Sequence, residues 1–200
     1  MKYTLLSFTL AGLLFANLAV AEKADAGKEI NILSDGAVYS SLKDAGTFSG
    51  NIVVTRGSLV MKGGKLDLTK TNTGYQSFVL LAENGKAATF RQKSDSGDDE
   101  WIEGEGARIE YSDQSEEMKI FSKAILRRMS GGKVIEEVQG ESIVYDSLKE
   151  IFKASNSNAG DSVAGAGRIK VVIQSREAQA ANTKALPTPV IAVPEKLPSK

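Results

Sequence analysis

The stretch TFSGNIVVTRGS, residues 47–58, contains the pattern that decides the fold. Phe48, Ile52 and Val54 alternate with small or polar residues around Gly50. A period of two places such side chains on one face of a β-strand. The turn residues 56–58 then supply a glycine, which readily adopts the positive φ of a tight hairpin. The stretch therefore predicts a strand that ends in a hairpin turn.

The same alternation recurs between residues 29 and 174, with turn-forming residues between the apolar pairs. The pairs and triplets include Ile30 with Ile32, Leu66 with Leu68, Ile109 with Tyr111, Ile143 with Tyr145, and Ile169 with Val171 and Ile173. All but one of the 19 glycines lie between positions 27 and 167, and the four prolines all follow position 186. Frequent turns without proline are typical of many short paired strands. The sequence predicts an all-β fold.

Residues 1–21 have the pattern of an export signal. Lys2 precedes an apolar stretch over 5–20, which ends in Ala-Val-Ala. The stretch is short for a membrane span, which needs about 20 apolar residues, and its end suits signal peptidase. A bacterial periplasm fits such a chain. We expect a cleaved signal peptide over 1–21, a short leader over 22–28, one domain over 29–174 and a disordered Pro/Ala/Lys tail over 175–200.

Composition excludes several functional classes. The chain has no His and no Cys, so it cannot form a Ser-His-Asp triad, a Cys nucleophile, a disulfide or the usual zinc site. Its 25 Lys and Arg residues balance 25 Asp and Glu residues, which removes the electrostatic argument for binding nucleic acid. We expect no cofactor, no metal site and no nucleic-acid partner.

Each of two groups of carboxylates could be either a functional site or an ordinary solvent-exposed surface. Residues 95–100 could form a calcium loop, but they lack the alternating ligand spacing, which favours an acidic hairpin tip in solvent. Glu103, Glu105 and Glu110, with Asp113 nearby, could mimic the carboxylate pair of a glycosidase. Alternation places Glu110 opposite the apolar face, which favours a solvated outer face. We predict no catalytic residue.

The basic residues Lys123, Arg127, Arg128 and Lys133 form the one concentration of positive charge. One interpretation is an ordinary solvated strand face. The other is a rim that meets phosphate or sugar groups of a ligand, because guanidinium groups bind phosphate oxygens in pairs.

Four segments of the sequence carry recognisable motifs: INILSD at 30–35, the stretch at 47–58, GKAATFRQ at 85–92 and GESIVY at 140–145. In this order, they resemble the LptA (OstA-like) family of periplasmic lipopolysaccharide carriers. The resemblance covers about residues 28–174. The chain departs from the family pattern at Arg56, at Ala87 and at 121–124, which affects loop geometry more than the fold.

The resemblance implies a single open, twisted β-jelly roll of many short antiparallel strands with an apolar interior slot. It implies that this slot shields the acyl chains of lipid A while the sugars stay outside. It also implies a periplasmic bridge of copies joined head-to-tail, with an LptC-like partner at the inner membrane and an LptD-like partner at the outer membrane. Two apolar inner faces that splay apart would suit such a ligand.

Residue-level expectations follow from the alternation and from the resemblance. We expect the acyl-facing positions to be Ile30, Ile32, Phe48, Ile52, Val54, Phe90, Ile109, Tyr111, Phe121, Ile143 and Tyr145. The same residues could instead form an ordinary closed core. Copies would join by strand addition at the assembly edges, which are Glu29, Ile30, Asn31 and Ile32 at one end and Arg168, Ile169, Lys170, Val171 and Ile173 at the other.

The sequence also leaves two other functional classes as alternatives. A secreted β-rich polysaccharide-active enzyme would need two carboxylates on one concave face. A structural or adhesion module would agree with the weak repetition of Gly-x-x-apolar-x-apolar segments and with the tail.

Overall fold

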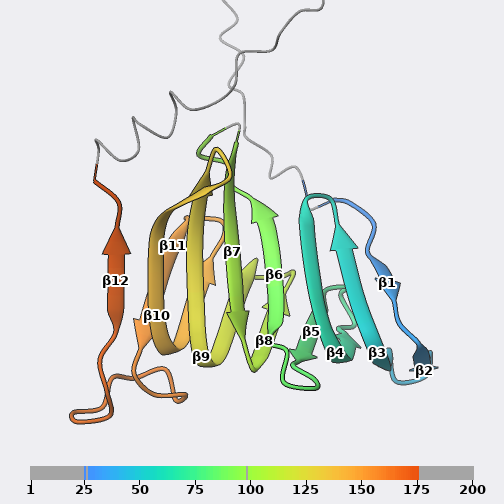
Figure 1. Cartoon of the computed structure of the whole chain (residues 1–200). Helices are drawn as coiled ribbons and strands as arrows, with labels where there is room; N and C mark the ends of the chain where they lie inside the picture. The colour runs from blue at the N-terminus through green and yellow to red at the C-terminus, as the bar shows by residue number, and fades with distance from the viewer. Residues whose placement is uncertain (1–24, 26, 98, 176–200) are drawn as a thin grey trace, which may run out of the picture.

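The computed structural model describes residues 25, 27–97 and 99–175, and every regular element in them is a β-strand (Figure 1). The all-β prediction is confirmed. The expected signal peptide and residues 176–200 of the expected tail lie outside the described residues. The strands are β1 (Asn31–Leu33), β2 (Gly36–Ser40), β3 (Ala45–Arg56), β4 (Leu59–Lys70), β5 (Gln76–Leu81), β6 (Ala88–Lys93), β7 (Glu100–Gly106), β8 (Arg108–Ser112), β9 (Glu117–Ser130), β10 (Lys133–Asp146), β11 (Ile151–Ser155) and β12 (Lys170–Ile173).

The strands pair antiparallel and form one sheet that folds over into two layers. Layer 1 contains β1, β6, β7 and β12, and layer 2 contains β2, β5, β8 and β11. The long strands β3, β4, β9 and β10 contribute one half to each layer. For example, β4 pairs with β6 through residues 60–62 and with β5 through residues 65–70. Figure 1 shows layer 1 across the front, with β5, β8 and β11 behind it.

The long strands cross between the layers along one side, which we call the hinge. Gly50 and Asn51 have φ angles of 75° and 47° where β3 bends, and the β3–β4 register shifts there. Ser122 and Lys123, at 61° and 57°, bend β9. Such left-handed residues produce β-bulges, which turn a strand sharply. The hinge is therefore built from continuous backbone.

The opposite side, which we call the mouth, consists of hairpin turns. Layer 1 contributes the turns at 56–59, 93–100 and 130–133, and layer 2 contributes those at 40–45, 70–76, 112–117 and 146–151. Each turn joins two strands of the same layer. No backbone among the described residues therefore connects the two layers at the mouth.

The core lies between the layers and is apolar. Alternate residues of every central strand point into it, as a period of two requires. Its largest fully buried side chains are those of Ile52, Val54, Leu59, Met61, Leu66, Phe78, Leu80, Ile109, Met118, Ile120, Val138 and Ile143. The described residues form no helix that is long and apolar enough to cross a membrane.

Candidate functional site

The candidate site is the interior between the two layers, and ten of the eleven predicted acyl-facing residues point into it. Seven of these are buried, and Ile30, Ile32 and Phe48 are partly buried and pack against the core. Register explains the shared face, because Ile32 lies opposite Val54 and Phe78 lies opposite Tyr111. The buried seven are Ile52, Val54, Phe90, Ile109, Tyr111, Ile143 and Tyr145.

Phe121 is the exception, and its predicted inward orientation differs from the structure. Ile120 is fully buried, so its neighbour Phe121 points to the outer face, just before the bulge in β9. There the guanidinium carbon of Arg108 lies 4.2 Å from the centre of the Phe121 ring. The ring therefore takes part in a cation–π contact on the outer face.

The four basic residues do not gather into one rim. Lys123 lies at the hinge, and Lys133 is the first residue of β10, directly after the turn that follows β9. Arg127 points outward to Glu137, at 2.7 Å, whereas Arg128 lies opposite Ile102 on the inner face. Alternation along β9 separates the two arginines, so the predicted phosphate rim is not assembled as a unit.

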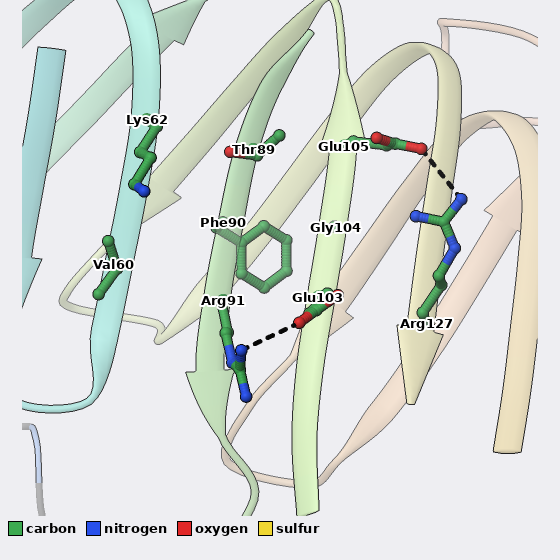
Figure 2. Close-up of a pocket in the computed structure, with 9 residues that line it drawn as sticks. All are labelled: Val60, Lys62, Thr89, Phe90, Arg91, Glu103, Gly104, Glu105 and Arg127. Carbon is green, nitrogen blue, oxygen red and sulfur yellow. Dashed lines mark hydrogen bonds and ion pairs between the residues drawn. The ribbon is translucent and has the colours of Figure 1, made fainter. Parts of the chain in front are cut away.

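The outer face of layer 1 has a shallow groove of about 340 Å³ (Figure 2). Its carboxylates are matched by arginines, because Arg91 lies 3.5 Å from Glu103 and Arg127 lies 3.1 Å from Glu105. Glu103 and Glu105 therefore sit on the outer face, and each has a cationic partner. The lining residues are Val60, Lys62, Thr89, Phe90, Arg91, Glu103, Gly104, Glu105 and Arg127.

A buried polar cluster, which we call the Arg56 clasp, joins the layers at the mouth. Arg56 of β3 donates a hydrogen bond to the Tyr111 hydroxyl at 2.6 Å, and that hydroxyl donates to Glu116 at 2.8 Å. The Arg56 Nη1 and Glu116 Oε1 atoms are 3.4 Å apart, and both side chains are about nine-tenths buried. Burial and the Glu116 carboxylate raise the pKa of Tyr111, so its hydroxyl keeps its proton and remains a donor.

A second polar cluster, which we call the Glu150 clasp, joins the layers further along the mouth. Glu150 of the layer-2 turn accepts hydrogen bonds from the Ser94 hydroxyl at 2.6 Å and the Asp95 amide at 3.0 Å. It also contacts the Ser96 hydroxyl and lies 4.0 Å from Arg128. Burial raises the pKa of Glu150, but these hydrogen bonds and the Arg128 charge outweigh it and lower the pKa below 4.5.

The sequence alone marks Tyr111 as inward-facing, but it does not mark the charged members of either clasp. Charged residues are normally assigned to solvent, and Glu116 and Glu150 lie in turns. A usable signal was present for Arg56, because it continues the alternation of Ile52 and Val54 onto the inner face.

The predicted assembly edges lie at the two ends of the sheet. Among the described strands, β1 pairs only with β3, and β12 pairs only with β10. Apolar side chains near these edges are exposed, with 49% of Val171, 70% of Ile173 and 67% of Leu33 accessible. Each edge is therefore a backbone surface able to pair with a further strand.

Comparison with known proteins finds a matching family and similar export proteins. A model of the family described as LptA/(LptD N-terminal domain) LPS transport protein matches residues 31–151. The lipopolysaccharide export system protein LptA of Haemophilus influenzae is 27% identical over 171 residues, which are 86% of this chain and 91% of that protein. LptH of Pseudomonas aeruginosa is 26% identical over 175 residues, covering 86% of this chain and 94% of that protein.

A solved structure has the same fold. It is the crystal structure of LptH, described as the LptA homologous periplasmic component of the lipopolysaccharide transport device of Pseudomonas aeruginosa. The TM-score is 0.64 at 23% identity, and the match covers 76% of this chain and 99% of that one. Since the family model spans more than half of the sequence, this chain belongs to the LptA/(LptD N-terminal domain) family of LPS transport proteins.

Proposed function

We propose that this protein is a periplasmic carrier of lipopolysaccharide that shields the acyl chains of lipid A between its two layers. The observation that carries this proposal is the continuous apolar cluster that the two inner faces form beside the polar groups of the mouth, while the layers are covalently joined only at the hinge within the described residues. Membership in a family of transport proteins supports the same function. An amphiphile that crosses an aqueous compartment needs such shielding, because exposed acyl chains are costly in water.

Loading requires the layers to separate. The cavity between Ile102, Val138 and Phe152 measures about 20 Å³, which is room for about one water molecule. Acyl chains would therefore replace the packing that the two inner faces now make with each other. Each methylene taken from water contributes about 0.8 kcal/mol, which offsets the cost of separating the two apolar faces.

We further propose that copies join head-to-tail by strand addition. The strand directions support this, because β1 runs from mouth to hinge and β12 runs from hinge to mouth. β12 of one copy can thus pair antiparallel with β1 of the next, and β11 with β2, which extends both layers. Ile32 would then continue the apolar inner face formed by Val171 and Ile173. An LptC-like partner and an LptD-like partner would occupy the two ends of the row.

The test is site-specific photo-crosslinking in a Gram-negative cell. The Phe90 side chain is buried in the core beneath the outer groove, whereas the side chain of the neighbouring Arg91 is exposed on the outer face. Ile32 and Leu33 form a second matched pair, with Leu33 on the outer face. We expect adducts with lipopolysaccharide at Phe90 and Ile32, and few at Arg91 and Leu33. Equal labelling of both faces, or none in a folded and functional protein, would contradict the proposal.

A complementary measurement identifies the ligand directly. The protein is purified from the periplasm without detergent, and a lipid extract is analysed by mass spectrometry. We expect lipid A to be recovered, and we expect less of it from a variant whose interior is narrowed by Gly104→Leu. The Cβ of that variant would lie 2.2 Å from Phe90 Cε1 and 2.8 Å from Ile120 Cδ1.

A further inference from the structure

The two layers are joined in different ways on their two sides. At the hinge, β3, β4, β9 and β10 carry the backbone from one layer to the other. At the mouth, side-chain and turn contacts alone hold the layers together within the described residues, and the Arg56 and Glu150 clasps are polar contacts of this kind. Any separation of the layers that keeps the strands intact must therefore occur at the mouth.

The chemistry of the clasps suits a seam that opens reversibly. When the mouth opens, the Arg56 guanidinium and the Glu116 carboxylate regain water, which compensates much of their lost attraction. An apolar seam regains no such compensation when it meets water. The polar mouth is thus easier to open than the apolar interior beside it.

Packing at the mouth is also looser than in the core. A cavity of about 80 Å³ lies there, lined in part by Gln92, Tyr145, Ser147 and Glu150. The Gln92 Oε1 atom is buried and has no hydrogen-bond partner among the described residues. Tyr145 and Glu150 also line the smaller cavity that reaches Ile102 and Val138 of the core. The two cavities are therefore adjacent, and they lie between the mouth and the apolar interior.

We propose that the mouth is a lateral gate through which acyl chains enter sideways between the layers, and that the Arg56 and Glu150 clasps keep this gate shut in the empty carrier. This inference rests on the proposed function. It assigns to the clasps the control of loading, whereas the apolar interior determines how much ligand is bound. The alternative route is end-on, between the edge strands at either end of the sheet.

The test is a reversible lock across the mouth. The chain contains no cysteine, so Ser96→Cys with Glu150→Cys introduces two thiols on opposite layers. A thiol cross-linker that contains a cleavable disulfide joins them and is released by reduction. The control pair, Arg91→Cys with Glu103→Cys, lies within layer 1 on the outer face and does not span the mouth. Fluorescently labelled lipopolysaccharide reports the rate of loading.

We expect the lock to slow loading at least about tenfold, and reduction to restore the rate. The control cross-link should leave the rate unchanged. A locked carrier that loads as fast as its reduced form would overturn the gate in favour of end-on entrance. Protein that is loaded first and locked afterwards should retain its ligand. If neither order of steps gives bound lipopolysaccharide in a folded protein, the proposed function itself fails, so the two failures are distinguishable.

A second variant tests the gate without a cross-linker. Ser94→Ala with Ser96→Ala removes two hydroxyl donors to Glu150 and leaves the apolar interior intact. We expect loading about threefold faster or more, with the same final amount bound. Unchanged or slower loading would contradict the role of the Glu150 clasp.

Discussion

The hinge and the mouth are the two long sides of the same folded sheet, and they join its two layers in different ways. The hinge uses glycines and left-handed residues to turn continuous strands through a sharp bend. The mouth uses turns that end each layer and charged side chains that reach across to the other layer. The hinge cannot separate without breaking backbone pairing, whereas the mouth can separate by exchanging side-chain partners for water.

This difference teaches that a buried ion pair need not be there for stability. Replacing a buried pair with apolar groups of similar volume is often neutral or stabilising, whereas removing one partner is costly. The Arg56 clasp therefore makes the mouth sensitive to single substitutions, and it holds the mouth shut less firmly than an apolar seam would. Variants on each side of the molecule test this contrast.

The largest effect is expected from Glu116→Leu, which deprives the buried Arg56 guanidinium of its carboxylate. We expect the free energy of unfolding to fall by about 3 kcal/mol, measured by urea titration. The matched control replaces the whole clasp, with Arg56→Met, Tyr111→Phe and Glu116→Leu together. It should unfold within about 1 kcal/mol of the unaltered protein and load lipopolysaccharide more slowly. If the triple variant were as unstable as Glu116→Leu, the proposed difference between removing one partner and replacing the whole clasp would be wrong.

The next effect concerns the hinge, where Gly106 ends β7. A Cβ at position 106 would lie 2.6 Å from Ile120 Cγ2 and 2.8 Å from the Phe121 carbonyl oxygen. The backbone of Phe121 cannot move easily to relieve the second contact. Gly106→Val should therefore cost about 2 kcal/mol. Gly85→Ala is the control, because Gly85 has a φ of 74° but no atom within 4 Å of a new Cβ, and it should cost about 1 kcal/mol. Equal losses would show that crowding at the hinge is unimportant.

A smaller effect is expected from acid at the Glu150 clasp. Because the folded-state pKa of Glu150 lies below its ordinary 4.5, its contribution to stability is present above pH 4.5 and is lost as the pH falls through the lowered pKa. The groups around it are Ser94, Ser96 and Arg128, with the Asp95 amide. Glu150→Gln should be less stable by about 1 kcal/mol at pH 7 and should approach the unaltered protein near pH 3. A constant difference between pH 7 and pH 3 would contradict this.

The smallest effect is expected from Arg127→Met, on the outer face. Arg127 is partly exposed and its hydrogen bond lowers the pKa of Glu137, but such pairs contribute little, about 0.5 kcal/mol. Lipopolysaccharide affinity should stay the same at every salt concentration. The neighbouring Arg128→Met should instead speed loading, because Arg128 belongs to the Glu150 clasp. A salt-dependent loss of affinity in Arg127→Met would restore the phosphate-rim interpretation.

The faces of the strands could be predicted from sequence because alternation is a local property. Ile109 with Tyr111 and Ile143 with Tyr145 point inward as their spacing indicates. Phe121 differs because an aromatic ring suggests burial, whereas the alternation of Met118 and Ile120 places position 121 on the outer face. The bulge that follows at Ser122 and Lys123 contains no glycine, so the sequence carries no signal for it.

The mouth could not be predicted, because its contacts join turns that are far apart in the sequence. Arg56 and Glu116 are 60 positions apart, and Ser94 and Glu150 are 56 positions apart. Composition predicts a solvent-exposed tip for the acidic segment at 95–100, and Asp95, Ser96 and Asp99 are indeed exposed. Composition does not indicate that the Asp95 amide and the Ser96 hydroxyl also bind Glu150. These groups meet only because the fold places their strands in opposite layers.

The unlike ends of the sheet give a row of these molecules a direction. Because β1 and β2 differ from β11 and β12, the proposed contact between copies is heterologous and does not close on itself. Antiparallel pairing at both layers would keep every mouth on the same side, so successive gates would line up as one continuous seam. The length of the row would then be fixed by end-capping partners, each of which needs to offer only one type of edge.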